Sequence, residues 1–238
     1  MPNFEHETLL QQQGFSRIAG VDEAGRGPLA GPVVAGAAVL PPDFVHKHSD
    51  ALNDSKKLSE KERNRLYEEI REGAHWGIGI VSAAEIDEMN IRIASWEALR
   101  RSLEDLETRF GALDYVLVDG LSVREMQWPW PHEALVKGDS RSLSIAAGSI
   151  LAKVTRDAMM QELDQEFAGY GFAKHKGYPT PPHYAALREL GPCPIHRQSF
   201  APVRDEAIRR GLIPAPPIPV KKRRVKAAPP QLELEELA

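Results

Sequence analysis

The chain has 238 residues, of which 42% are hydrophobic and 27% are charged, and its 30 Lys and Arg against 34 Asp and Glu give a net charge of −4. This composition indicates one large domain, or one domain with an appendage, and excludes a uniformly basic nucleic-acid-binding domain. Because the chain has no run of 18 apolar residues, no apolar leader and a single cysteine, Cys193, we expect a cytoplasmic protein without a membrane span or a disulfide framework.

The first predicted elements are two strands and a helix. Apolar residues at 17–21 and β-branched residues at 32–40 flank a segment rich in glycine and proline, which is typical of a β-hairpin. Ser59 then has the character of a helix N-cap, and apolar residues recur at helical spacing until Gly73. We therefore predict an amphipathic helix between these two residues.

Strand and helix patterns alternate through the middle of the chain. Residues 76–81 predict a strand, Ser82 opens a predicted capping box at a helix start, and residues 93–110 predict a long helix. Residues 115–118 predict a further strand, and 142–167 predict a second long helix whose small residues allow close packing on the sheet. This alternation predicts an α/β domain.

The C-terminal part has a different composition. A loop rich in Gly, Pro, His and Lys leads to a predicted short helix at 184–190, which we interpret as a helical lid. The last residues are rich in proline and basic side chains and have too few large apolar residues to form a core. We therefore predict an N-terminal extension (1–16), a folded domain (17–212) and a disordered tail (213–238).

Four carboxylates stand where strands end or helices begin. Asp22 and Glu23 follow the first strand directly, Asp119 follows the strand at 115–118, and Asp139 precedes the long helix. Ligands of α/β sheets gather at the carboxyl ends of strands, so we expect these acids to form one cluster. The alternatives are a surface acidic turn at Asp22 and a helix cap at Asp139. Hard oxygen ligands favour Mg²⁺ or Mn²⁺, and a pair of such ions suits a phosphate ester as substrate.

The same acids lie in motifs that resemble a known family. Five segments match it in order and spacing: GVDEAGRGPLAGPVVAGAAV, LNDSKKLSEKER, YVLVDG, VKGDSRSLSIAAGSILAKVTRD and FAKHKGYPT. Across residues 18–204 the chain resembles bacterial ribonuclease HII, the type 2 ribonuclease H family. The resemblance implies a ribonuclease H-like fold, with a mixed central sheet flanked by helices and a small C-terminal helical extension. Residues 17–212 would then be the catalytic domain.

The resemblance implies an endoribonuclease that depends on Mg²⁺ or Mn²⁺, with two ions expected when substrate is bound. Asp22, Glu23, Asp119 and Asp139 match the family's catalytic and metal-binding carboxylates. Such an enzyme hydrolyses the RNA strand of RNA–DNA hybrids and cuts 5′ to single ribonucleotides in duplex DNA, leaving 5′-phosphate and 3′-hydroxyl ends. These nucleic acids are the expected partners, ribonucleotide removal from DNA is the expected role, and a monomer is the expected state.

Six further residues match positions that contact nucleic acid in the family. They are Gly25, Arg26, Gly27, Lys56, Lys57 and Tyr178. The resemblance implies that the GRG loop at 25–27 contacts the 2′-hydroxyl region of the ribonucleotide through its backbone. It also implies that Tyr178 packs on the sugar at the ribonucleotide–deoxyribonucleotide step and that the two lysines contact the nucleic-acid backbone. Without the resemblance, a half-buried loop tyrosine and solvated lysines are the alternatives.

Two rival functions and one further partner follow from the same sequence. A module that binds hybrid junctions without cutting would need the GRG loop and the lysines but not the acids. The pattern VDEAGRG also suits the phosphate loop of a sugar-kinase-like or actin-like ATPase, although no duplicated domain is visible. The tail ends in PQLELEELA, which faintly resembles the glutamine-leucine peptides that bind bacterial sliding clamps but lacks their terminal aromatic residue. A weak clamp contact through the tail is therefore a further hypothesis.

Overall fold

A five-stranded mixed sheet forms the centre of the computed structural model, which describes residues 1–120 and 128–214. Its strands, in the spatial order β3-β2-β1-β4-β5, are β1 (Ile18–Ala24), β2 (Val33–Val39), β3 (His75–Val81), β4 (Tyr115–Asp119) and β5 (His132–Leu135). β2 pairs antiparallel with both β1 and β3, whereas β4 runs parallel to both β1 and β5. The sheet confirms the predicted hairpin and the predicted α/β fold class.

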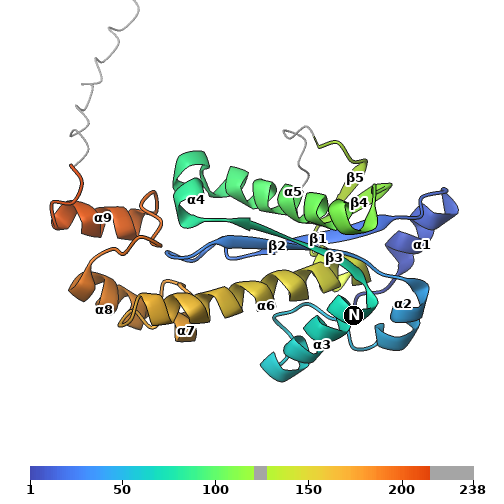
Figure 1. Ribbon diagram of the computed structural model, residues 1–238, viewed down its shortest axis with the longest axis horizontal. Coiled ribbons are helices and arrows are strands. Elements are labelled where there is room, and N and C mark those ends of the chain that lie inside the picture. The colour runs from blue at the N-terminus through green and yellow to red at the C-terminus, as the bar shows by residue number, and fades with distance from the viewer. Residues whose placement is uncertain (121–127, 215–238) are drawn as a thin grey trace, which may run out of the picture.

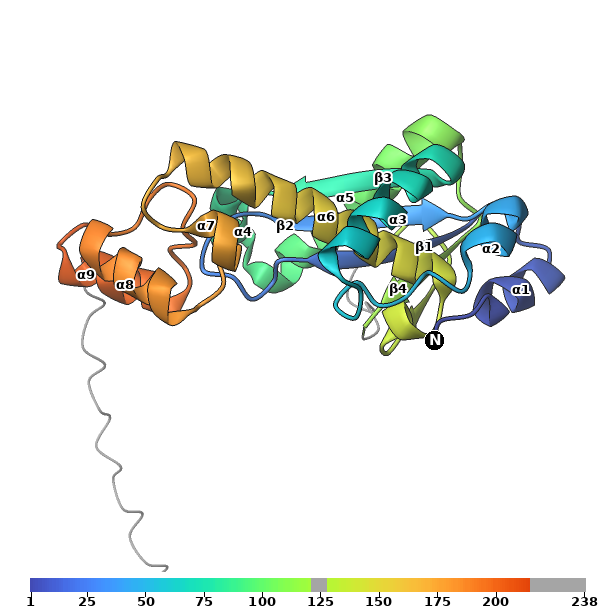
Figure 2. The same ribbon diagram turned by 90° about the horizontal axis from the view of Figure 1, so that it is seen from below.

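Helices cover both faces of this sheet (Figure 1). They are α1 (Glu5–Gln12), α2 (Pro42–His48), α3 (Glu60–Gly73), α4 (Ala83–Met89), α5 (Ile91–Phe110), the 3₁₀ turn η1 (Gly138–Ser140), α6 (Leu143–Glu166), α7 (Phe172–His175), α8 (Pro181–Leu190) and α9 (Ala201–Arg209). α5 packs on one face of the sheet and α6 on the other, where α3 lies against α6. α8 and α9 lie together beyond one end of the sheet (Figure 2). The flanked mixed sheet and the C-terminal helical extension agree with the prediction.

Side-chain caps begin the helices where the sequence predicted them. Ser59 and Ser82 each accept a hydrogen bond from the backbone N–H three residues later, and the glutamate at that later position bonds back to the serine N–H. Ser142 caps α6. The helix predicted at 93–110 starts two residues earlier, because the side chain of Asn90 caps α5. Among the described residues, no helix is long and apolar enough to span a bilayer.

β1 extends past the predicted strand, and this changes the position of two acids. Asp22 and Glu23 do not follow the strand but continue its ladder, opposite Gly36 and Ala35 of β2. The chain stays extended there because β2 is long enough to keep pairing. α1, α2, β5, α7 and α9 were not predicted, since each is shorter than ten residues and has no long periodic pattern.

Two glycines allow α6 to lie directly on the sheet. A Cβ atom on Gly36 of β2 would lie 2.4 Å from the carbonyl oxygen of Gly148, and one on Gly148 would lie 2.6 Å from the carbonyl oxygen of Gly36. A Cβ on Gly148 would also lie 3.3 Å from the backbone nitrogen of Asp22. Because neither glycine has room for a side chain, the pair sets the distance between α6 and the strand that carries Asp22.

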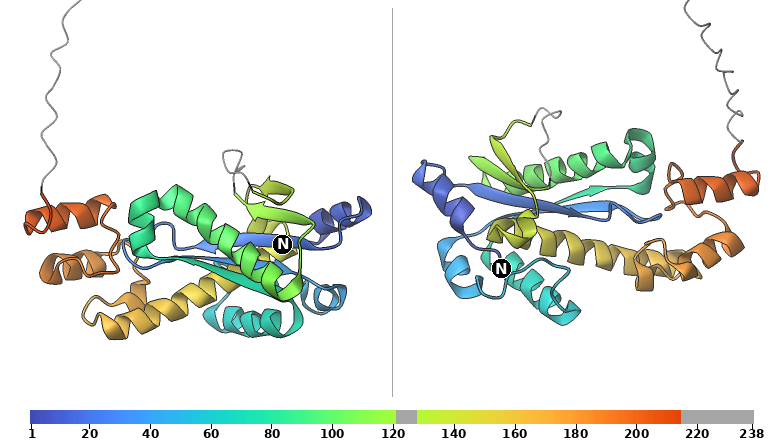
Figure 3. Two further views of the ribbon diagram at one scale, coloured as in Figure 1. Left: turned by 45° about the horizontal axis from the view of Figure 1, so that its top comes forward. Right: turned by 180° about the vertical axis from the view of Figure 1, so that it is seen from behind.

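The N-terminal segment lies against the start of α6 (Figure 3). Asn3 forms a β-bridge with Ser142, and the buried carboxylate of Glu7 accepts hydrogen bonds from the hydroxyls of Ser142 and Ser144. The predicted extension (1–16) therefore contacts the segment that leads from η1 into α6. The predicted tail (213–238) lies outside the described residues from residue 215 on.

Candidate active site

Predicted acids from two strands and a turn lie at one edge of the sheet. Val21 of β1 pairs with Val118 of β4 in parallel register, so the next residues along the two strands, Asp22 and Asp119, are neighbours. Asp139 lies in η1, and Asp119 Oδ1 accepts a 2.6 Å hydrogen bond from the N–H of Gly138 in the same turn. The structure thus brings together Asp22 and Asp119, which are 97 residues apart in the sequence.

Asp22 and Glu23 point to opposite faces of β1, because adjacent residues of a strand alternate. Asp22 is on the face covered by α6, where Ser149 hydrogen bonds to it, and is 5% exposed. The side chain of Glu23 is 11% exposed, and its Oε1 lies 3.2 Å from Nη1 of Arg26. This burial contradicts the alternative of an acidic turn at the surface.

Burial, together with neighbouring carboxylates, raises the pKa values of three of the acids. Burial, followed by the charges of Glu23 and Asp119, raises the pKa of Asp22 well above its usual range. Burial is also the main cause that raises the pKa of Glu23, and burial and then Asp119 raise the pKa of Asp139. The cluster therefore carries more negative charge than its surroundings neutralise, which favours binding of a cation.

The donor set fits a hard divalent cation. Its predicted ligands are carboxylate oxygens, without histidine or cysteine, and such a set suits Mg²⁺ or Mn²⁺. In the ranges 1–120 and 128–214, no group of three or more His, Cys, Asp or Glu side chains is already arranged around a metal position. The acids form an open site, in which a bound ion would take further ligands from water or from substrate phosphate.

Lys56 lies beside the acids, whereas Lys57 does not. Lys56 Nζ is 3.9 Å from Oδ2 of Asp139. Burial would lower the pKa of Lys56, but the attraction of the surrounding carboxylates, led by Asp22, raises it. Lys57 Nζ instead lies 4.0 Å from Oδ2 of Asp54, and its side chain is 58% exposed. The Lys56 side chain is itself 78% exposed, so the alternative of a solvated lysine fits both side chains, and the two differ in that only Lys56 pairs with a predicted acid.

Two serines link the segment of Lys56 to Asp22. Ser55 Oγ lies 2.8 Å from Ser149 Oγ in a buried hydrogen bond, and Ser149 also bonds to Asp22. Arg63 of α3 donates a 2.5 Å hydrogen bond to the carbonyl oxygen of Ser55. Neither serine was predicted as a site residue, because single hydroxyls form no distinctive spacing; the one available signal was the place of Ser55 inside the motif NDSKK.

The GRG loop and Tyr178 lie side by side. Gly25 has a φ of +99°, and a Cβ atom there would lie 2.1 Å from Nε of Arg156, so no other residue fits without displacement. A Cβ on Gly27 would lie 3.7 Å from Cε1 of Tyr178, a residue that is 43% exposed. The structure therefore places an accessible tyrosine ring next to backbone that carries no side chain, as a sugar-binding surface requires.

Two buried arginines pack against the GRG loop, and one of them hydrogen bonds to it. Arg197 donates hydrogen bonds to the carbonyl oxygens of Gly25 and Arg26, at 2.6 and 3.0 Å. Arg156 donates to the carbonyl oxygen of Pro32 at 2.9 Å. Burial lowers the pKa of Arg197 to about 9, so it remains a cation at neutral pH. Arg197 was missed by the sequence analysis, because its acceptors are carbonyl oxygens far along the chain and no motif marks them.

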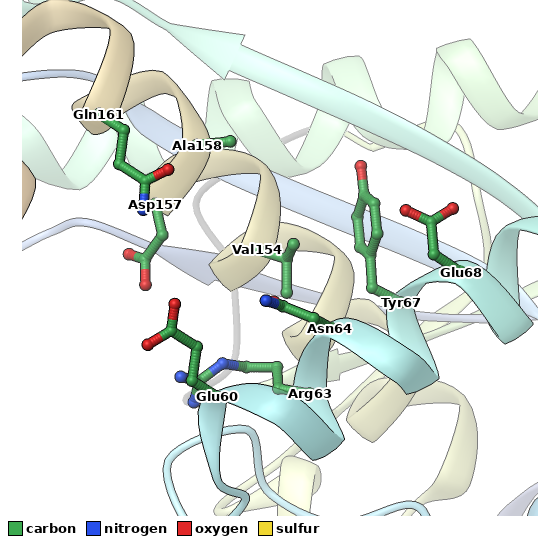
Figure 4. A pocket seen from close by; sticks show the side chains of 9 residues that line it. All are labelled: Glu60, Arg63, Asn64, Tyr67, Glu68, Val154, Asp157, Ala158 and Gln161. Atoms are coloured by element: carbon green, nitrogen blue, oxygen red, sulfur yellow. The ribbon is translucent and has the colours of Figure 1, made fainter.

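A surface hollow between α3 and α6 carries none of the predicted site residues (Figure 4). Glu60 and Glu68 of α3 and Asp157 of α6 line it, beside Arg63. Three carboxylates against one guanidinium make this hollow a poor match for a phosphate backbone. The predicted acids and the GRG loop therefore remain the candidate site.

Comparisons with known proteins cover the same part of the chain. A family model described as "Ribonuclease HII" matches residues 19–203, which include every predicted site residue. Ribonuclease HII of Syntrophotalea carbinolica is 52% identical over 200 residues, 84% of this chain and 92% of that protein. The crystal structure of ribonuclease H2 from Pyrococcus horikoshii OT3 matches with a TM-score of 0.68 and 28% identity, over 82% of this chain and 98% of that one. A structure of the PCNA:RNase HII complex from Archaeoglobus fulgidus matches with a TM-score of 0.63 and 29% identity, over 78% of this chain and 95% of that one.

Proposed function

The chain belongs to the ribonuclease HII family, and on that premise we propose that Asp22, Glu23, Asp119 and Asp139 form its catalytic and metal-binding centre. Membership of the family makes the chain a ribonuclease H, an endonuclease that acts on the RNA strand of RNA–DNA hybrids. We extend this activity to incision 5′ to a single ribonucleotide in duplex DNA, with 5′-phosphate and 3′-hydroxyl products, and so to ribonucleotide removal from DNA in the cytoplasm.

One observation carries the proposal: carboxylates from β1, β4 and η1 meet at one sheet edge, where burial and neighbouring charges raise the pKa values of Asp22, Glu23 and Asp139. Burying several negative charges together costs stability unless a cation joins them. A fold that keeps such a group therefore gains from it in another way, and binding of a divalent cation with a phosphate ester accounts for the arrangement.

Mg²⁺ or Mn²⁺ at these four carboxylates would supply a more acidic water as nucleophile and positive charge for the phosphodiester, and we expect two ions with substrate bound. The protein's own part is to hold the carboxylates in place. Ser149 hydrogen bonds to Asp22, and Gly138 donates to Asp119. Both donors lie on segments fixed by α6, so the positions of the acids depend on the packing of this helix on the sheet.

Recognition of the ribonucleotide falls to the GRG loop and Tyr178 in this proposal. Gly25 and Gly27 present backbone without side chains, and Tyr178 presents a ring beside them. A site built to hydrogen bond to a hydroxyl strongly rejects a ligand that lacks it, because its own polar groups are then left without partners. Backbone contact with the 2′-hydroxyl would thus separate RNA from DNA at the cut.

In this proposal, basic side chains beside the acids contact the phosphates of the substrate. Lys56 faces the acids, and Arg26 extends from the GRG loop with its side chain 57% exposed. Both side chains are more than half exposed and are therefore accessible to a phosphate at the site. Lys57 pairs with Asp54, so we assign it a weaker contact with the nucleic-acid backbone further from the cut.

The decisive experiment is cleavage of a labelled DNA duplex that contains one ribonucleotide, with Mg²⁺, Mn²⁺ or EDTA. We expect the wild-type protein to nick 5′ to the ribonucleotide with either metal and EDTA to stop the reaction. The Asp119→Asn variant should give no product, and the wild type should not cut an all-DNA duplex. Binding of the ribonucleotide duplex without cleavage under either metal would overturn the catalytic assignment and favour a junction-binding module. Hydrolysis of ATP in the absence of nucleic acid would favour the ATPase instead.

A further proposed partner is a sliding clamp, through the tail that ends in PQLELEELA. It is supported by the tail's likeness to clamp-binding peptides and by the Archaeoglobus fulgidus relative, whose structure was solved as a complex with PCNA. Binding of the chain to a purified bacterial clamp, compared with a chain that ends at residue 230, tests it. Equal binding of both chains would remove the tail from the proposal. We also propose that the free protein is a monomer, which its mass in solution tests.

A further inference from the structure

A continuous chain of hydrogen bonds ends on the backbone of Tyr178. The N–H of Cys193 donates to Nδ1 of His196 at 3.0 Å. Nε2 of His196 lies 3.1 Å from Nε2 of His183, and Nδ1 of His183 lies 3.0 Å from the carbonyl oxygen of Tyr178. Both rings are buried, with exposed fractions of 0% for His183 and 1% for His196. The chain therefore connects the segment before α9, through α8, to the turn that carries the predicted sugar contact.

The partners at the two ends decide which nitrogen of each ring carries the proton. A carbonyl oxygen only accepts, so His183 must carry its proton on Nδ1, which leaves its Nε2 as an acceptor. His196 must then donate from Nε2, which leaves its Nδ1 free to accept from Cys193. This is the one pair of neutral tautomers that satisfies all three contacts. Reversing either ring would bring two donors or two acceptors together.

The surroundings keep both rings neutral. Burial lowers the pKa of His183 and, to about 4, that of His196. The groups that face the rings are His175, stacked on His183 at 4.5 Å, Tyr170, 5.1 Å from His196, and the thiol of Cys193, 3.1 Å from His196 Nδ1. None of these three groups is an anion in its ordinary state at neutral pH, so an added proton would leave one ring donor without an acceptor.

The turn around Tyr178 is fixed on both sides. The N–H of Tyr178 donates to the carbonyl oxygen of His175 at 2.9 Å, and its carbonyl oxygen also accepts from Thr180 at 2.8 Å. One residue earlier, the carbonyl oxygen of Gly177 accepts from Leu29, which follows the GRG loop, at 2.8 Å. The backbone direction at Tyr178, and with it the place of the ring beside Gly27, thus depends on this set of bonds. Among the described residues, His183 supplies the one side-chain hydrogen bond to the carbonyl oxygen of Tyr178.

We propose that His183, held in one tautomer by His196, is a positioning residue for Tyr178 and so sets the preference for the ribonucleotide–deoxyribonucleotide step. The inference rests on the proposed contact between Tyr178 and the sugar. His183 is fully buried and touches no substrate. The proposed catalytic acids lie on β1, β4 and η1, so we expect substitution of His183 to leave metal binding unchanged. Its effect should be confined to substrates that contain a ribonucleotide–deoxyribonucleotide step.

Two substitutions of His183 separate its hydrogen bond to Tyr178 from its volume. Asn places an amide N–H near the position of Nδ1, whereas Gln places its amide near Nε2 and loses the donor to Tyr178. His48→Gln is the matched control, because His48 is also buried, with its Nδ1 3.1 Å from Oε2 of Glu69, but lies in α2. Each full-length variant is assayed with Mg²⁺ on a duplex with one ribonucleotide and on a uniform RNA–DNA hybrid.

We expect His183→Gln to lower kcat on the single-ribonucleotide duplex by about tenfold, the effect of one buried hydrogen bond, and to change kcat on the uniform hybrid by less than about twofold. His183→Asn keeps most of the wild-type preference. His48→Gln is expected to lower the thermal unfolding midpoint, as His183→Gln does, but to leave the substrate preference unchanged. Equal losses on both substrates with His183→Gln would show a general structural effect and overturn the proposal.

A double variant tests whether His183 acts through Tyr178. His183→Gln combined with Tyr178→Ala is expected to be no slower on the single-ribonucleotide duplex than Tyr178→Ala alone. Losses that add in full would overturn the inference. If wild-type protein cuts the duplex and Tyr178→Ala cuts it equally well, the sugar contact and this inference both fail while the nuclease assignment stands. If wild-type protein cuts neither substrate, the proposed function itself fails.

Discussion

The guanidinium of Arg197 donates a 2.6 Å hydrogen bond to the carbonyl oxygen of Gly25, 172 residues earlier in the chain. The same guanidinium donates to the carbonyl oxygens of Arg26 and Gly31, so one side chain spans the whole turn between β1 and β2. Because the carbonyl oxygens of the GRG loop point toward the Arg197 guanidinium, the other side of the loop is free to face a ligand. The C-terminal segment thus shapes the loop that we propose contacts the ribonucleotide.

Arg197→Lys is expected to destabilise the protein and slow cleavage, even though the charge is retained. An ammonium group is a compact charge without the planar fork of donors, so carbonyl oxygens of the loop lose partners. We expect a loss of about 2–4 kcal/mol in the free energy of unfolding and at least about a tenfold fall in kcat/KM. Urea unfolding and cleavage assays measure both. Arg204→Lys on α9, where the side chain is 47% exposed, should change neither.

Gly25→Ala and Gly14→Ala form a matched pair. Both glycines have a positive φ, of +99° and +97°, but an added Cβ meets Arg156 at Gly25 and nothing within 4 Å at Gly14. We expect Gly14→Ala to cost about 1 kcal/mol of stability from backbone strain and to leave cleavage intact. Gly25→Ala should cost more and abolish detectable incision at a ribonucleotide. Equal activity in the two variants would contradict the assigned role of the loop.

Glu7→Ala tests the contact between α1 and the start of α6. Glu7 is buried and accepts from Ser142 Oγ at 2.6 Å and from the N–H of Ser144 at 3.1 Å, where a helix N-terminus favours a negative charge. Removal of the carboxylate leaves these donors unsatisfied, so we expect the free energy of unfolding to fall by about 2–3 kcal/mol. We also expect a severalfold lower kcat, because Asp139 lies in η1, directly before α6, and would be held less firmly. Glu5→Ala, at an exposed position of α1, should lower the free energy of unfolding by only about a few tenths of a kcal/mol.

Asp22→Asn should stabilise the metal-free protein while it inactivates the enzyme. The folded-state pKa of Asp22 is raised, so the stability tied to its protonated form is fully present below the ordinary value of 3.8 and is lost as pH rises through the raised value. In EDTA near neutral pH, we therefore expect a higher unfolding midpoint for Asp22→Asn than for wild type. Cleavage should fall at least about a hundredfold. A lower midpoint in EDTA would contradict the electrostatic account.

His196→Gln should flatten the acid dependence of stability. Because burial lowers the folded-state pKa of His196 from 6.5 to about 4, the unfolded chain takes up the proton first, and stability falls as pH drops from 6.5 toward 4. We expect this fall, a few kcal/mol at most, to be smaller in His196→Gln than in wild type. Urea unfolding at several pH values across this range measures it, with His48→Gln as control. Parallel curves would show that another group causes the fall.

Local chemistry predicted much of the fold. The N-cap at Ser59, the capping box at Ser82, the hairpin and the long helices depend on residues within a few positions of one another, and the structure reproduces them. Asp22 and Asp119 could be selected as candidates in the same way, because each stands at or near a strand end, a few residues or one residue before a glycine. The parallel pairing of β1 with β4 in the structure is consistent with the predicted alternation of strands and helices.

Only the tertiary structure decided which distant groups support the site. Arg197, Glu7 and the pair formed by His183 and His196 act through backbone or side-chain partners that lie far along the chain or in separate segments, and no spacing pattern marks such contacts. The extension of β1 through Asp22 likewise depended on the length of its partner strand. A hydrogen bond needs only proximity in space, so its partners emerge once the chain is folded, whereas helices, turns and caps arise from neighbours in sequence.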